Sequence, residues 1–167
     1  MVDVWNMTSQ ITSKRELYDQ LASQLRGLLE GEHDLIANAA NFSSLVFHSL
    51  PDLNWAGFYL LKDGELVLGP FQGQPACVRI AMGKGVCGTA AAKRETVIVP
   101  NVHEFPGHIA CDTASTSEIV VPIMKGEKLI GVIDLDSPSQ SRFDEEDAAG
   151  LETLAGILLA SITTNDT

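Results

Sequence analysis

The chain has 167 residues, of which 45% are hydrophobic, and its 22 acidic and 11 basic side chains give a formal net charge of −11 at pH 7. This length suits one domain with a sizeable core, and the apolar content is too high for a disordered chain. The acidic balance disfavours duplex nucleic acid and anionic membrane surfaces as partners, because only Lys and Arg neutralise their negative charge.

The N-terminal part of the chain predicts two helices. Ser13 precedes a run of leucines at helical spacing, and Glu16 stands at the capping-box offset from it, so a helix is expected from Ser13 to about Gly31. A second amphipathic helix is expected over residues 34–50. Residues 1–12 lack the apolar segment of a secretory signal, and we interpret them as a flexible N-terminal extension.

The remainder predicts short strands that are joined mostly by hairpins and followed by a closing helix. The expected strands are 55–61, 66–68, 77–82, 96–99, 118–124 and 128–136, with a short helix over 89–94 and a terminal helix from residue 143. This order indicates one α+β domain, residues 1–167, with a largely antiparallel sheet packed against helices. The long loops at 69–76 and 100–116 are where a functional site is expected.

A glycine motif between a predicted strand and a predicted helix invites a nucleotide-binding interpretation. Residues 83–88 spell G-x-G-x-x-G. The dinucleotide fingerprint needs a parallel β-α-β unit with an acidic residue at the end of the next strand, whereas that strand here ends at Pro100. We therefore interpret the motif as a turn that starts a helix, whose free N–H groups could hold an anion such as a ligand carboxylate.

Three carboxylates are expected to converge at one end of the sheet. Asp134 and Asp136 lie two residues apart in a predicted strand and therefore share a face, about 6.7 Å apart by strand rise. Glu118 stands near the start of the neighbouring predicted strand. Crowded acids raise one another's pKa, so such a cluster could hold a proton for general acid catalysis, bind an ammonium group or bind a metal. The alternative is that these acids simply meet solvent at a strand end.

Three cysteines and no signal peptide indicate a reducing cytoplasm rather than a disulfide-stapled secreted domain. Cys111 lies in a polar segment of small residues, which favours a reactive thiol over a buried one. Cys87 is close to a predicted helix N-terminus, where the helix dipole favours a thiolate, and Cys77 begins a predicted strand. A zinc site from Cys111, His108 and a second cysteine is an alternative, but the spacing matches no structural zinc signature.

Several of these segments together resemble the free methionine-(R)-sulfoxide reductases, small enzymes of the GAF fold. The resemblance runs from about residue 14 to the C-terminus. The segments that carry it are residues 53–60, 85–91, the loop around Cys111, residues 118–122 and residues 131–137. It implies a GAF-like single domain with a six-stranded, largely antiparallel sheet flanked by helices.

The resemblance also implies a redox reaction. Cys111 would attack the sulfur of free methionine-(R)-sulfoxide and become a sulfenic acid as methionine leaves. A second thiol would condense with it to a disulfide that thioredoxin reduces. Cys77 is the favoured resolving thiol and Cys87 the alternative.

The same resemblance gives the other site residues their roles. Glu118 and Asp136 would donate a proton to the leaving oxygen, and Asp134 would bind the substrate ammonium. Trp55 and Tyr59 lie four apart in a predicted strand, hence on one face, and would form the wall of the pocket around the S-methyl group.

The expected partners are therefore the free sulfoxide and thioredoxin, with no bound cofactor and no metal. The oligomeric state stays open, a homodimer being one option. Two other functions remain as alternatives: a GAF module that senses a small ligand without chemistry, and a thiol redox sensor that has no substrate.

Overall fold

The computed structural model describes residues 13–108 and 114–162. The helices are α1 (Lys14–Leu29), α2 (Leu35–Ser49), α3 (Gly85–Lys93) and α4 (Glu145–Ile162), and a single 3-10 turn covers Val102–Glu104. The strands are β1 (Trp55–Lys62), β2 (Glu65–Gly73), β3 (Arg79–Ala81), β4 (Val97–Val99), β5 (Ser117–Lys125) and β6 (Lys128–Ser137). The expected extension, residues 1–12, lies outside the described part of the chain.

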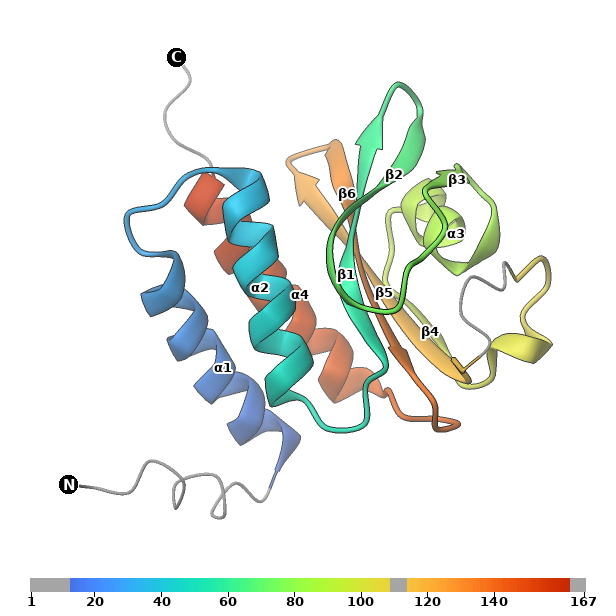
Figure 1. The fold of residues 1–167 in the computed structure, drawn as a ribbon, viewed down its shortest axis with the longest axis horizontal. Helices are drawn as coiled ribbons and strands as arrows, with labels where there is room; N and C mark the ends of the chain where they lie inside the picture. The colour runs from blue at the N-terminus through green and yellow to red at the C-terminus, as the bar shows by residue number, and fades with distance from the viewer. Residues whose placement is uncertain (1–12, 109–113, 163–167) are drawn as a thin grey trace.

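The six strands form one antiparallel sheet in the order β3-β2-β1-β6-β5-β4, which confirms the α+β prediction. Helices α2 and α4 cover one face, with α1 packed outside them, and α3 lies on the other face (Figure 1). Within the described ranges, none of the helices combines the length and hydrophobicity needed to cross a lipid bilayer.

The two N-terminal helices begin where their caps predict. The Ser13 side chain accepts a hydrogen bond from the Glu16 N–H at 3.2 Å, and the Asp34 side chain accepts from the Ala37 N–H at 2.8 Å. Each cap satisfies a backbone donor that has no partner inside the helix. The apolar side of α2 then packs on β1 and β2, whereas that of α1 packs on α4 and α2, which lie between it and the sheet.

Three element boundaries near the site differ from the prediction. The strand expected over 66–68 runs from Glu65 to Gly73, so most of the loop expected at 69–76 belongs to β2. The strand expected from Cys77 is only Arg79–Ala81, so Cys77 lies in the segment that precedes β3. The helix expected from residue 89 begins at Gly85, so Cys87 lies in the first turn of α3. Gly88 permits this early start, because a Cβ at that position would come within 2.5 Å of the Ala81 carbonyl oxygen.

Strand pairing fixes the relative positions of the acids. Asp136 on β6 lies opposite Glu118 on β5 and opposite Trp55 on β1. Asp134, two residues earlier on β6, lies opposite Gly57 and Val120. The pleat therefore directs both aspartates to the same face of the sheet, the face that α3 covers.

Candidate active site

A small cavity lies between the sheet and the start of α3. Its wall contains most of the predicted site residues that the structure describes. They are Trp55, Tyr59, Cys87, His108, Glu118, Asp134 and Asp136, together with Ala76, Ile80, Lys84, Gly85, Val86 and Ser115. The structure thus brings the three carboxylates and the two aromatic rings into the wall of one cavity.

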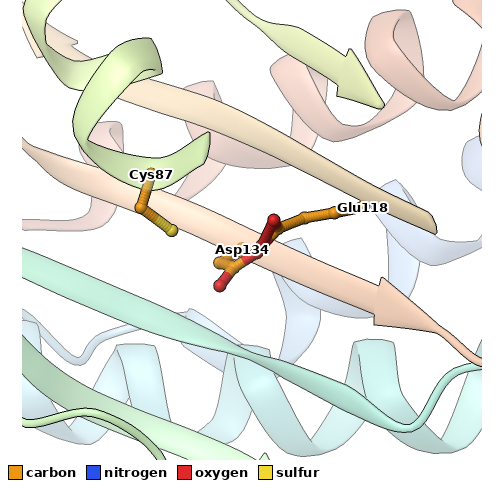
Figure 2. Close-up of side chains that lie close together, drawn as sticks. All are labelled: Cys87, Glu118 and Asp134. Atoms are coloured by element: carbon orange, nitrogen blue, oxygen red, sulfur yellow. The ribbon is translucent and has the colours of Figure 1, made fainter. Parts of the chain in front are cut away.

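The acids and one thiol form a tight, buried cluster at the base of this cavity. The Cys87 sulfur and carboxylate oxygens of Glu118 and Asp134 all lie within 4.8 Å of one another. Cys87 projects from α3 toward the two carboxylates (Figure 2). A thiol and two carboxylates are groups that zinc accepts as ligands, so these three residues are also the cluster that could hold a metal ion.

Burial and crowding favour the protonated forms of these groups. Burial, followed by the charges of Asp134 and Asp136, raises the pKa of Glu118 well above its ordinary value. Burial also raises the pKa of Asp134, although hydrogen bonds from Glu118 and Cys87 oppose that rise. Glu118 is therefore the proton holder of the cluster, and Asp134 is its acceptor.

One oxygen of Asp134 lacks a donor among the residues that the structure describes. This atom, Oδ1, is buried and accepts no hydrogen bond from residues 13–108 or 114–162, and the residue is only 5% exposed. Because a buried carboxylate oxygen without a donor is costly, this oxygen can accept a hydrogen bond from a donor such as a ligand ammonium.

Cys87 differs from the prediction based on the helix dipole. Its thiol is free and buried, and burial, followed by the charges of Asp134 and Glu118, raises its pKa well above the ordinary value. These effects oppose the helix dipole, so the neutral thiol is the favoured form. Cys77 is half-buried and disulfide-bonded. Cys111 lies outside the described residues.

Aromatic side chains form one side of the cavity. The rings of Trp55 and Tyr59 are stacked with centroids 6.0 Å apart, and Phe71 stacks on the other side of Trp55 at 5.2 Å. Burial, followed by the charge of Asp134, raises the pKa of Tyr59, so its hydroxyl keeps its proton. The stacked rings give this side of the cavity a largely apolar surface.

The cavity also contains polar residues that the sequence patterns did not single out. Lys84 precedes the first turn of α3, and Ser115 accepts a hydrogen bond from the Asn54 amide at 3.1 Å. The lysine and the free N–H groups of the helix start can bind an anion. His108, which the sequence offered as a candidate zinc ligand, also lines the cavity, and burial, followed by the charge of His103, lowers its pKa. The glycine motif indicated the helix start, whereas Ser115 carried no signal in the sequence.

Comparison with known proteins places this arrangement in a class. The sequence profile described as GAF domain matches residues 38–162, most of the chain. With its six-stranded antiparallel sheet and flanking helices, the protein is a GAF domain.

Two curated relatives define the family more closely. The chain is 49% identical to the free methionine-R-sulfoxide reductase of Escherichia coli, over 92% of this chain and 93% of that protein. It is 47% identical to the enzyme of the same name from Saccharomyces cerevisiae, over 87% and 86%. The chain therefore belongs to the free methionine-R-sulfoxide reductase family.

A solved structure of a third relative agrees in fold. The structure of fRMsr of Staphylococcus aureus in complex with substrate is 51% identical and superimposes with a TM-score of 0.84. The match covers 87% of this chain and 95% of that chain.

Proposed function

We propose that this protein reduces free methionine-(R)-sulfoxide to methionine with Cys111 as nucleophile. The observation that carries the proposal is the buried cluster, in which Glu118 holds a proton beside an Asp134 oxygen that lacks a donor. A free amino acid has an ammonium group for Asp134 and, as a sulfoxide, an oxygen that must be protonated. Family membership adds weight, because the relatives carry this activity in their names.

The proposed reaction consumes two thiols and releases water. Cys111 attacks the sulfoxide sulfur, Glu118 or Asp136 protonates the oxygen, and methionine leaves while Cys111 becomes a sulfenic acid. The Cys77 thiol then attacks that sulfur, forming the S–S bond as the S–O bond breaks and water departs. Thioredoxin supplies two electrons and two protons to restore both thiols, so no bound cofactor is needed, and a reducing cytoplasm is the compartment that suits this cycle.

The state of the two described cysteines supports Cys77 as the resolving thiol. Cys77 is disulfide-bonded and lies in an exposed segment, whereas Cys87 is free, buried and hydrogen-bonded to Asp134. A resolving thiol must reach its partner and then be accessible to a reductant. Because Cys87 is buried, it does not meet the second requirement where it lies.

Asp134 gives the proposed selectivity for the free amino acid. A peptide-bound methionine has no ammonium group, so it would leave the buried Asp134 oxygen without a donor. Lys84 and the N–H groups at the start of α3 are our candidates for the substrate carboxylate, and Trp55 with Tyr59 for the S-methyl group.

The test is NADPH consumption with thioredoxin and thioredoxin reductase. We expect turnover of the free R epimer, little of the free S epimer and little of the N-acetylated form. Cys111→Ser should form no methionine. Cys77→Ser should form about one methionine per protein molecule and then stop, whereas Cys87→Ser should continue to turn over. No turnover of the free R epimer would favour a ligand-sensing GAF module or a thiol redox sensor, and equal turnover of the acetylated form would contradict the role of Asp134.

A further inference from the structure

The segment between β2 and β3 carries Cys77 on an exposed stretch of backbone. Gln74 and Pro75 are exposed, Val78 is 61% exposed, and the residues from 74 to 78 belong to neither strand. A chain of this kind samples many conformations unless side chains hold it. A disulfide tolerates only a narrow range of geometries, so the position of Cys77 needs an explanation.

Two buried aromatic side chains on β1 hold this segment through its carbonyl groups. The Tyr59 hydroxyl donates to the Cys77 carbonyl oxygen at 2.8 Å, and the Trp55 indole N–H donates to the Gln74 carbonyl oxygen at 3.1 Å. Both residues are 2% exposed and lie on a strand between β2 and β6. The anchors are therefore fixed by the rigid centre of the sheet, while the segment they hold lies at its surface.

We propose that Tyr59 is a positioning residue for the Cys77 sulfur, with Trp55 as a second anchor for the same segment. The inference rests on the proposed function, in which Cys77 is the resolving thiol. By fixing the Cys77 carbonyl, the Tyr59 hydroxyl raises the effective concentration of the Cys77 thiol at the sulfur with which it pairs. Tyr59 thus both lines the cavity and holds the backbone of the proposed resolving cysteine.

The burial of Tyr59 keeps this anchor in its donating form. Because burial raises the pKa of the phenol, the hydroxyl stays protonated at any pH at which the thiols react. The anchor therefore does not weaken across the working pH range of thiol–disulfide exchange.

The chain offers a matched control, because its two tyrosines are both buried and each donates one hydrogen bond of 2.8 Å. Tyr18 donates to Asp147 on the helical face, remote from the cavity. The experiment equilibrates wild type, Tyr59→Phe and Tyr18→Phe with mixtures of reduced and oxidised dithiothreitol. The dithiol-to-disulfide ratio is then read by alkylation and mass spectrometry.

We expect Tyr59→Phe to shift the exchange equilibrium about fivefold toward the dithiol, the effect of one neutral hydrogen bond. Tyr18→Phe should lower the melting temperature but leave the exchange equilibrium at the wild-type value. An unchanged equilibrium in Tyr59→Phe, or an equal shift in Tyr18→Phe, would overturn the proposal.

If Tyr59→Phe does not fold, Trp55→Phe removes the second anchor and is judged by the same two criteria. The exchange involves no sulfoxide, so a wild-type protein without turnover would count against the proposed function alone.

Discussion

Glu118 is the residue whose burial bears most directly on the proposed catalysis. It lies opposite Asp136 on the neighbouring strand, and burial together with the two aspartates raises its pKa well above that of an ordinary carboxyl group. A general acid must be protonated to act, so this raised pKa keeps Glu118 competent at neutral pH. An exposed glutamate, by contrast, would be ionised there.

We expect Glu118→Gln to lower kcat for free methionine-(R)-sulfoxide by about 100-fold or more, because a carboxamide donates poorly to a leaving oxygen. In wild type, kcat/KM should fall as pH rises through the raised pKa of Glu118, and the variant should lack this alkaline limb. The pH–rate profiles of the two proteins provide the measurement. Glu127→Gln, an exposed glutamate in the β5–β6 turn, serves as control, and a wild-type profile in Glu118→Gln would point to Asp136 as the donor.

The local sequence pattern was sufficient to predict that the acids lie close together, but not whether the Cys87 thiol is ionised. The two-residue spacing of Asp134 and Asp136 defines a shared face in any strand, and the strand order then brings Glu118 alongside. The ionisation of Cys87, however, depends on two carboxylates that are 31 and 47 residues away along the chain (118 − 87 and 134 − 87). The helix-dipole argument considers only residues near Cys87 in the sequence, so it omits these carboxylates. Ser115 was missed because its place in the cavity likewise depends on the tertiary fold.

At the scale of elements, α1 is attached to the start of α4 by a buried carboxylate. Asp147 is 1% exposed and accepts hydrogen bonds from the Tyr18 hydroxyl at 2.8 Å and the Lys14 ammonium at 2.7 Å, and it pairs with Arg142 at 3.4 Å. Its oxygens thus join two helices that are far apart in the sequence. Helix propensity alone would not place α1 on α4.

We expect Asp147→Ala to lower the free energy of unfolding by about 3 kcal/mol, because it leaves two cations and a phenol without their shared partner. Urea denaturation monitored by circular dichroism provides the measurement. The control is Glu65→Ala, which breaks an exposed pair with Arg79 and should cost less than about 1 kcal/mol. Equal losses in the two variants would show that Asp147 is no more than a surface partner.

Element boundaries near the site were the least predictable part of the fold. The sequence indicated a strand from Cys77 and a helix from residue 89, whereas the structure begins β3 at Arg79 and α3 at Gly85. Both shifts depend on tertiary contacts. Tyr59 and Trp55 hold the segment before β3, and the close approach of Gly88 to Ala81 permits the early helix start.

At the scale of the whole molecule, the sheet has the larger apolar core on one face and the candidate active site on the other. One face packs against α2 and α4 in an apolar core that α1 completes from outside, and the other face carries the cavity and its acids beneath α3 (Figure 1). Two of the acidic side chains counted in the formal net charge of −11, Glu118 and Asp134, are therefore buried, and the raised pKa of Glu118 favours its neutral form. A protein that buries carboxyl groups for catalysis is less stable than it would be without them.

The pH dependence of the free energy of unfolding should reveal how much stability the burial of Glu118 costs. The folded pKa of Glu118 is raised, so its contribution to stability is fully present below its unfolded pKa of about 4.3 and is lost as pH rises through the folded value. Glu118→Gln has no such proton to lose. Its stability advantage over wild type should therefore be small near pH 4 and should grow toward neutral pH, by at most about 1.4 kcal/mol per pH unit. Urea titrations of both proteins between pH 4 and 8 measure the difference, with Glu127→Gln expected to track wild type throughout. A difference that stays constant with pH would mean that Glu118 is ionised in the folded protein and cannot be the proton donor.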